Sequence, residues 1–247
     1  MKTLCIIPAR LESTRFPKKI LCTLLDKPML VWVYEAACRV KAFDKVVFAI
    51  DSLEAAALLD RYQIPYHMTP KELASGTDRL AYLCKNNLEK ADVWVNWQAD
   101  EPLISEKMIL DLLEVAHTKE ADVYTLKKRL ESHQEIFSSH ICKVVSNIEG
   151  SALYFSRSPI PASRDGNWDY KNLFKHVGLY AFPEKTLKTL DTLDTCPYEE
   201  EEKLEQLRFL YNGLKVQLGL TEEEAFGIDL KEQLVEAERR LALQLTL

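Results

Sequence analysis

Four cationic side chains lie within ten residues of one another in the first long loop of the chain: Arg10, Arg15, Lys18 and Lys19. The loop follows a predicted buried strand, Thr3–Ala9. Ligands of open α/β sheets bind outside the carboxyl ends of the strands, so these side chains are placed to hold a polyphosphate. A solvated surface loop is an equally good interpretation of the same residues.

Two acidic residues, Asp100 and Glu101, follow another predicted strand, Asp92–Gln98. Mg²⁺ is typically bound by one or two carboxylates together with phosphate oxygens, so Asp100 could hold the metal of a nucleotide. The pair could instead form the turn that ends the strand. Asp229 is also open to two interpretations, because Asp229-Leu-Lys-Glu232 fits a helix capping box while its carboxylate could bind a metal.

Glycine is rare, with 7 among 247 residues, where average usage of about 7 % would give roughly 17. The chain has no G-x-G-x-x-G and no G-x-x-x-x-G-K-[ST], so any nucleotide must be held by another device. Gly76 lies in Ser75-Gly-Thr-Asp-Arg79, just before a predicted helix. Either its backbone must approach a ligand closely or the segment is an ordinary Ser/Thr cap.

The second half carries scattered cations that could bind an acidic substrate, although each is singly typical of a surface: Arg157, Arg164, Lys175 and His176. A helix is predicted over Tyr198–Asn212. Its buried stripe would consist of Leu204, Leu207, Leu210 and Tyr211. Glu205 and Gln206 would then point toward solvent or a cleft.

The elements that must position these residues alternate between strand and helix over the first 121 residues. Strands are predicted at Thr3–Ala9, Lys45–Ile50, Pro65–Thr69 and Asp92–Gln98. Helices are predicted from Pro28 to about Lys41, at Ser52–Tyr62 with Ser52 as its cap, at Thr77–Asn87, and from Ser105 to about Lys119. This alternation predicts a doubly wound, mostly parallel α/β sheet.

The pattern changes after residue 121. Strands are predicted at Asp122–Arg129, Cys142–Asn147, Ala152–Ser156 and Phe174–Phe182. They indicate a smaller inserted subdomain, mixed or antiparallel, at about 122–212. A strand at Lys215–Leu220 and a helix from about Leu230 would complete the main domain, formed by 1–121 and about 213–247.

Composition excludes several classes of protein. The chain is 47 % hydrophobic and 28 % charged with a net charge of −6, which argues against a nucleic-acid or anionic-membrane partner. The cysteines lie at least 16 residues apart and the histidines lack metal-binding spacings, so a zinc site is not expected. The N-terminal apolar run is too short for a signal peptide and no segment approaches a membrane span, so we expect a reduced cytoplasmic protein.

Six motifs in order make the chain similar, essentially from end to end, to the 3-deoxy-manno-octulosonate (Kdo) cytidylyltransferases, or CMP-Kdo synthetases. The motifs are Ile7-Pro-Ala-Arg10 with Ser13-Thr-Arg-Phe-Pro-x-Lys19; Met68-Thr69 with Ser75-Gly-Thr-Asp-Arg-Leu80; Gln98-x-Asp-Glu-Pro102; Ala152-Leu-Tyr-Phe-Ser-Arg157 with Ile160-Pro161; His176-x-Gly-x-Tyr180; and Leu204-Glu-Gln-Leu-Arg208.

The resemblance implies a Rossmann-like nucleotidyltransferase fold and a Mg²⁺-dependent reaction. The anomeric hydroxyl of Kdo would attack the α-phosphorus of CTP, giving CMP-Kdo and pyrophosphate for lipopolysaccharide synthesis. A homodimer formed through the inserted strands is implied as well.

The resemblance also implies roles for individual residues. The implied catalytic residues are Arg10, Lys19 and Asp100. The implied nucleotide contacts are Pro8, Ala9, Arg10, Arg15, Lys19, Thr69, Ser75, Gly76, Thr77, Arg79 and Gln98. The implied sugar contacts are Arg157, Arg164, His176, Tyr180, Glu205 and Gln206. The implied metal ligands are Asp100 and Asp229.

Several positions depart from the family pattern, including Leu230-Lys231 after Asp229, where Thr-Pro is expected. Lys18 and Ala99 stand where the family has glycine, and Trp97 replaces a smaller aliphatic residue. Two alternatives therefore stay open beside Kdo transfer. One is the same transfer to another acidic sugar, such as 8-amino-Kdo or a nonulosonic acid, and the other is a non-catalytic CTP-binding homologue.

Overall fold

The computed structural model describes residues 1–13 and 16–245. The chain forms two compact units, Met1–Ile109 with Glu224–Leu247, and Leu110–Glu223. These bounds differ from the predicted division at 121 and 213. Residues 213–223 lie in the second unit because strand β11 (Val216–Leu220) pairs in parallel with β7 (Val123–Arg129).

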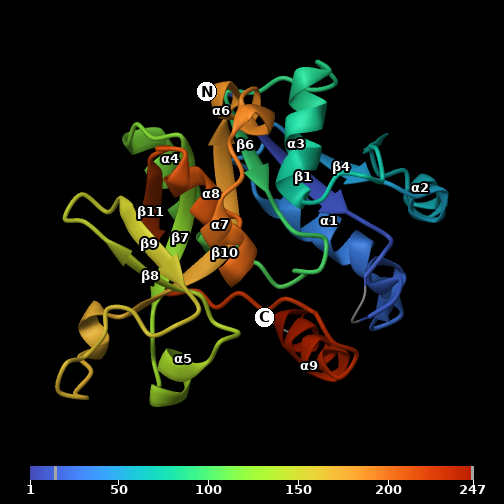
Figure 1. The fold of residues 1–247 in the computed structure, drawn as a ribbon. Coiled ribbons are helices and arrows are strands. Elements are labelled where there is room, and N and C mark those ends of the chain that lie inside the picture. The colour runs from blue at the N-terminus through green and yellow to red at the C-terminus, as the bar shows by residue number, and fades with distance from the viewer. Residues whose placement is uncertain (14–15, 246–247) are drawn as a thin grey trace. The chain divides into compact units, whose positions relative to one another are not determined.

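The first unit is built on four parallel strands in the order β6-β1-β4-β5, drawn in blue to green in Figure 1. Their bounds are β1 (Thr3–Ala9), β4 (Lys45–Ile50), β5 (Tyr66–Met68) and β6 (Val93–Asn96). Every residue of β1 is buried, as expected of a central strand covered on both faces. The predicted α/β class with a mostly parallel sheet is confirmed.

The helices of this unit follow the strands as the sequence pattern indicates. They are α1 (Met29–Arg39), α2 (Leu53–Arg61) and α3 (Gly76–Lys85). The Oγ atom of Ser52 accepts the Ala55 N–H at 3.1 Å, so the predicted cap of α2 is confirmed. Ser75 caps α3 in a reciprocal box with Asp78. These caps place the N-termini of α2 and α3 at the carboxyl side of the sheet.

The second unit is a mixed sheet, as the strand pattern predicts. Strand β10 (Phe174–Pro183) runs antiparallel to β7 and to β8 (Lys143–Ser146). Strand β9 (Ala152–Ser156) pairs antiparallel with β8. Helix α4 (Glu106–Thr118) begins in the first unit and ends in the second.

The single helix predicted over Tyr198–Asn212 is wrong. The segment forms α7 (Pro197–Glu202) and α8 (Gln206–Tyr211), because Lys203 has a left-handed backbone with φ 54° that ends the first helix. The break changes which side chains face the core. Gln206 is only 3 % exposed, whereas Tyr211, predicted to be buried, is 50 % exposed.

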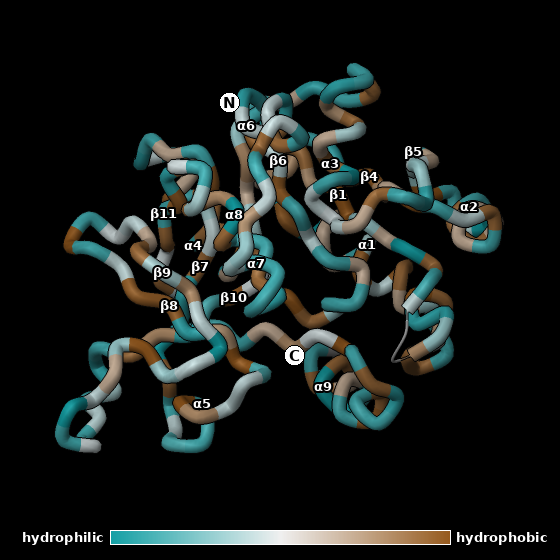
Figure 2. Tube along the Cα trace, viewed as in Figure 1, coloured by the Kyte–Doolittle hydropathy of each residue, from teal (hydrophilic) through white to brown (hydrophobic). Residues whose placement is uncertain are grey.

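The remaining elements are short apart from the C-terminal helix. They are β2 (Thr23–Leu24), β3 (Lys27–Pro28), α5 (His133–Phe137), α6 (Glu184–Leu187), α9 (Gln233–Leu245), and the 3₁₀ helices η1 (Lys19–Leu21), η2 (Tyr170–Asn172) and η3 (Leu190–Thr192). Figure 2 shows hydrophobic stretches along the buried strands and hydrophilic loops around them. Over residues 1–13 and 16–245, no helix combines the length and the apolarity needed to cross a membrane.

Candidate active site

A cluster of charged groups in the first unit joins three distant segments of the chain. The Lys19 side chain is almost completely buried, and its Nζ atom lies 2.5 Å from Asp100 Oδ2 and 3.1 Å from Asp229 Oδ1. Lys19 belongs to the loop after β1, Asp100 follows β6, and Asp229 precedes α9. The structure therefore brings together three of the predicted catalytic and metal-binding residues.

The turn that carries Asp100 is held at two points. The Trp97 Nε1–H donates to the Glu101 carbonyl at 3.0 Å, and the Ile228 N–H donates to the Asp100 carbonyl at 2.9 Å. Ala99 is buried within this turn and is not among the residues with a left-handed backbone. Alanine at position 99 is therefore accommodated without backbone strain.

Glu101 lies beside this cluster and is the second of the two acidic residues that follow the predicted strand. Its Oε2 atom has no hydrogen-bond partner. Burial, together with the nearby Asp100 and Asp229, raises the pKa of Glu101 to about 8 against the opposing effect of Lys19. Glu101 is therefore mostly protonated at neutral pH.

The donor set fits a divalent cation held partly by substrate. Asp100 and Asp229 both reach one ammonium group, so their oxygens are close enough to share one ion. No group of three or more metal-ligating side chains occurs in the part of the chain that the structure describes. Two carboxylates with phosphate and water completing the shell are what Mg²⁺ prefers in proteins.

The alternative interpretation of Asp229 is a helix capping box with Glu232. The structure has a different residue in the reciprocal position. The backbone N–H groups of Asp229 and Leu230 donate to Gln233 Oε1 at 2.7 and 2.8 Å. Gln233, and not Glu232, therefore reaches back over the start of the helix. The Asp229 carboxylate contacts Lys19.

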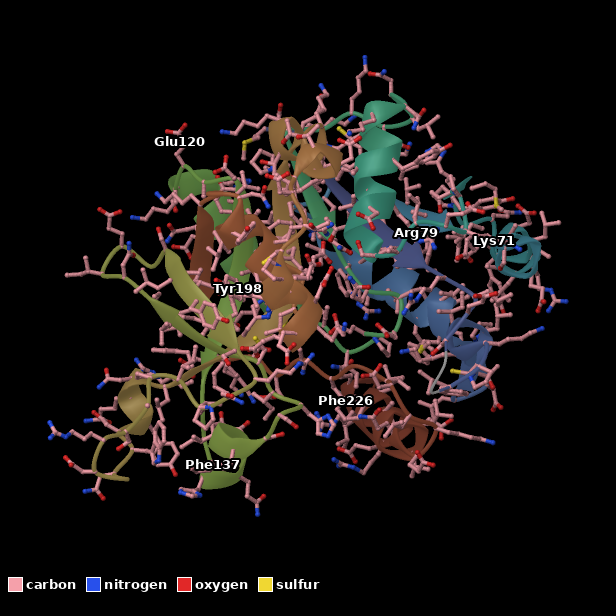
Figure 3. All side chains as sticks on the ribbon, in the orientation of Figure 1. Lys71, Arg79, Glu120, Phe137, Tyr198 and Phe226 are labelled. Carbon is pink, nitrogen blue, oxygen red and sulfur yellow. The ribbon has the colours of Figure 1, made fainter. Side chains whose placement is uncertain are left out.

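Arg79, which is labelled in Figure 3, and Thr69 are two predicted nucleotide contacts that bind protein groups. Arg79 is 2 % exposed, and its Nη2–H donates to Asp51 Oδ2 at 2.8 Å while Nη1–H donates to Thr69 Oγ1. Asp51 in turn accepts the Leu11 N–H at 2.9 Å. This chain of contacts fixes the start of the cationic loop against β4 and α3.

The sequence analysis missed Asp51. A signal was present, since Asp51 directly follows the buried strand β4, just as acidic residues follow β6. Its ion pair with Arg79 joins α3 to that end of the sheet.

Five other predicted nucleotide residues come together at the N-terminus of α3. A Cβ added to Gly76 would lie 2.8 Å from Pro8 Cγ and 3.2 Å from Gln98 Nε2. Gln98 donates to Asn96 Oδ1 at 3.1 Å, and Asn96 donates to Thr77 Oγ1 at 3.3 Å. Gly76 is therefore needed for close packing against β1, while Ser75 supplies the cap.

A pocket opens beside the cationic loop. Its lining consists of Arg10, Leu11, Glu12, Asp51, Ser52, Lys71 and Leu73. Ala9, the last residue of β1, leads directly into this lining. The pocket includes the predicted Arg10 and adds Lys71, a cation that the sequence analysis did not single out (Figure 3). Arg15 lies outside the described residues.

In the second unit, three predicted sugar contacts lie side by side. The Tyr180 hydroxyl donates to Gln206 Oε1 at 3.1 Å, and the His176 and Tyr180 ring centroids are 5.4 Å apart. Burial lowers the pKa of His176 to about 3, so its imidazole is neutral. His176 Nε2 lies 2.9 Å from Thr125 Oγ1, which is also 2.8 Å from the Leu179 carbonyl.

Arg157 and Lys143 tie loops of this unit together. Arg157 donates to the carbonyls of Glu202, Ser139 and Lys203 at 2.6, 2.9 and 3.3 Å. The sequence analysis missed Lys143, which is fully buried and donates to three backbone carbonyls: those of Ser138, Ile141 and Arg157. A lysine within an ordinary strand pattern gives no sequence signal for such a role.

The other two predicted sugar contacts are placed differently. Glu205 forms an ion pair with Arg208 at 3.5 Å. Arg164 is exposed in a turn, and no contact joins it to His176 or Tyr180 among the described residues.

Known proteins resemble this chain in sequence and in fold. Residues 4–217 match the cytidylyltransferase family. The chain is 40 % identical to a 3-deoxy-manno-octulosonate cytidylyltransferase of Thermodesulfovibrio yellowstonii, over 98 % of both chains. It is 39 % identical to the protein of the same name from Chloroherpeton thalassium, over 99 % of this chain and 100 % of that one.

A solved structure extends the likeness to the fold. It is a CMP:2-keto-3-deoxy-manno-octonic acid synthetase complexed with CTP, 32 % identical, with a TM-score of 0.92 over 99 % of this chain and 100 % of that chain. Family, relatives and fold thus agree over nearly the full length of the chain. The chain belongs to the 3-deoxy-manno-octulosonate cytidylyltransferase family.

Proposed function

We propose that this protein transfers CMP from CTP to Kdo and releases pyrophosphate, with Mg²⁺, for lipopolysaccharide synthesis. The observation that carries the proposal is the contact of Lys19 with both Asp100 and Asp229. A nucleotidyl transfer needs cationic groups where phosphate charge develops, and carboxylates for the divalent ion. The same small cluster supplies both.

In the proposed reaction, the anomeric oxygen of the sugar forms a bond to the α-phosphorus as the bond to the bridging oxygen of pyrophosphate breaks. Bound Mg²⁺ would neutralise phosphate charge, held by Asp100 and Asp229. The ion pairs orient the ammonium of Lys19, which could also offer an N–H donor to phosphate oxygens. Arg10 lines the pocket beside the cationic loop and would hold the same phosphates.

The proposed sugar contacts divide into two kinds. Neutral His176, with Tyr180 and Gln206, would hydrogen-bond sugar hydroxyls, since a neutral imidazole offers no charge to a carboxylate. We assign Arg157 to holding the surrounding loops, because its N–H groups already bind carbonyls. Arg164, which is exposed, remains the cation proposed for the sugar carboxylate.

A homodimer and a cytoplasmic location are part of the same proposal. Leu153, Tyr154 and the neighbouring Ile148 are apolar side chains exposed on and beside β9, which suits a surface that pairs with a second copy. Light scattering of the purified protein would measure its mass. All six cysteines are free thiols, which is typical of a reducing compartment.

The test is pyrophosphate release from CTP, with and without Mg²⁺ and Kdo. We expect release only when all three are present. Asp100→Asn should lower turnover by at least about 100-fold, because one metal-binding charge is lost. Asp60→Asn, on the exposed face of α2, is the control and should leave turnover unchanged.

The outcomes separate the alternatives. Faster release with 8-amino-Kdo or a nonulosonic acid than with Kdo would assign another sugar. Calorimetric binding of CTP without release from any of these sugars would identify a non-catalytic homologue. Wild-type turnover in Asp100→Asn would remove this carboxylate from the metal site.

A further inference from the structure

Trp97 is a completely buried side chain whose one polar atom reaches the turn that carries Asp100. Its indole Nε1–H donates to the Glu101 carbonyl at 3.0 Å, and its ring meets Phe43 edge-on at 6.5 Å. The acceptor belongs to the residue next to Asp100. The hydrogen bond therefore restrains the turn that carries the Asp100 carboxylate.

Two backbone hydrogen bonds also restrain this turn. The Glu101 N–H donates to the Gln98 carbonyl at 3.2 Å, and the Asp100 carbonyl accepts the Ile228 N–H at 2.9 Å. An aliphatic side chain at position 97 would be smaller and could not donate a hydrogen bond. The indole therefore provides a restraint that packing alone does not supply.

We propose that Trp97 is a positioning residue, which holds Asp100 where its carboxylate meets Lys19 and the metal ion. This inference rests on the proposed metal role of Asp100. A side chain of this kind acts on the metal through the ligand that it orients, and removing such a partner typically weakens metal binding or activity about 10- to 100-fold.

Trp94, three residues earlier and within β6, offers a matched control. It is also completely buried, and its Nε1–H donates to the Ala91 carbonyl at 3.1 Å. That acceptor precedes β6, whereas the Trp97 acceptor follows it. Replacing either tryptophan with phenylalanine removes one buried indole hydrogen bond, but only Trp97→Phe frees the turn of Asp100.

The experiment compares the wild type, Trp97→Phe and Trp94→Phe. The Kd of CTP is measured by calorimetry without sugar, once with excess Mg²⁺ and once in EDTA. We expect Trp97→Phe to bind CTP about tenfold more weakly than the wild type with Mg²⁺, and within about twofold of it in EDTA. Trp94→Phe should stay within about twofold under both conditions.

Two results would overturn the inference while the proposed function stands. In the first, Mg²⁺ raises the CTP affinity of Trp97→Phe as much as that of the wild type. In the second, Trp94→Phe loses as much CTP affinity as Trp97→Phe does. A wild type whose CTP affinity does not depend on Mg²⁺ would overturn the metal role itself, and this inference with it. The two failures are therefore distinguishable.

A second variant covers the case in which Trp97→Phe does not fold. Incorporation of 3-benzothienylalanine at position 97 preserves the shape of the ring and replaces the N–H with sulfur. We expect the same tenfold weakening with Mg²⁺. Wild-type affinity in this variant would show that packing alone, and not the hydrogen bond, sets the position of Asp100.

Discussion

Lys18 has a left-handed backbone, with φ 54°, immediately before η1. For a residue with a Cβ this conformation costs roughly 1–2 kcal/mol. Its ammonium group lies 2.7 Å from the Glu54 carboxylate, but both side chains are more than half exposed. The ion pair therefore offsets little of the backbone strain. Glycine at this position would remove the strain.

We expect Lys18→Gly to raise the free energy of unfolding by about 1 kcal/mol, measured by urea denaturation. Lys18→Ala is the control, since it removes the same ion pair but keeps a Cβ. It should not stabilise the protein. Equal stability of the two variants would show that the backbone at this position carries no strain.

At the scale of elements, the N-terminus of α3 is held against β1 by close contact at Gly76 and Pro8, while the Asp51–Arg79 ion pair joins α3 to the end of β4. A methyl group at Gly76 would approach Pro8 Cγ to 2.8 Å, closer than carbon atoms can pack. The helix must then move away from the strand end that leads into the cationic loop.

Gly76→Ala should therefore lower the free energy of unfolding by about 1–3 kcal/mol and weaken CTP binding. Thermal unfolding and calorimetric titration with CTP measure the two effects. Gly178→Ala is the control, because a Cβ added at Gly178 would meet no atom within 4 Å. Equal behaviour of the two variants would contradict the packing argument.

The stability of the whole molecule depends on pH through His176. Burial lowers the pKa of this imidazole from 6.5 to about 3. Between these values the unfolded chain binds a proton that the folded chain does not, so the free energy of unfolding falls as the pH is lowered. The slope is about 1.4 kcal/mol per pH unit, and it vanishes above about pH 6.5.

His176→Gln removes this contribution. Between pH 6.5 and pH 5 we expect the stability of the wild type to fall by about 2 kcal/mol relative to the variant, in urea denaturation at each pH. Taking the difference cancels the titration of other groups. His117→Gln, at an exposed position on α4, should follow the wild type. Parallel curves for the wild type and His176→Gln would show that the imidazole titrates normally in the fold.

Much of the fold follows from local patterns in the sequence. The apolar run at β1 and the alternation of strands with helices predict the parallel sheet, because a strand covered on both faces must be apolar throughout. The cap at Ser52 is also a local property, since its partner lies three residues away. The six motifs, found in the family's order, indicate the family. The resemblance to that family then implies most of the residues proposed for the site.

Other features depend on contacts between distant residues. Lys19 and Asp229 are 210 positions apart, and only folding shows that one ammonium group meets two carboxylates. The pKa of Glu101 and the protein partners of Arg79 come from burial, which composition and spacing do not reveal. The turn at Lys203 breaks a helix whose apolar period continues across it, because tertiary packing outweighs helix propensity there.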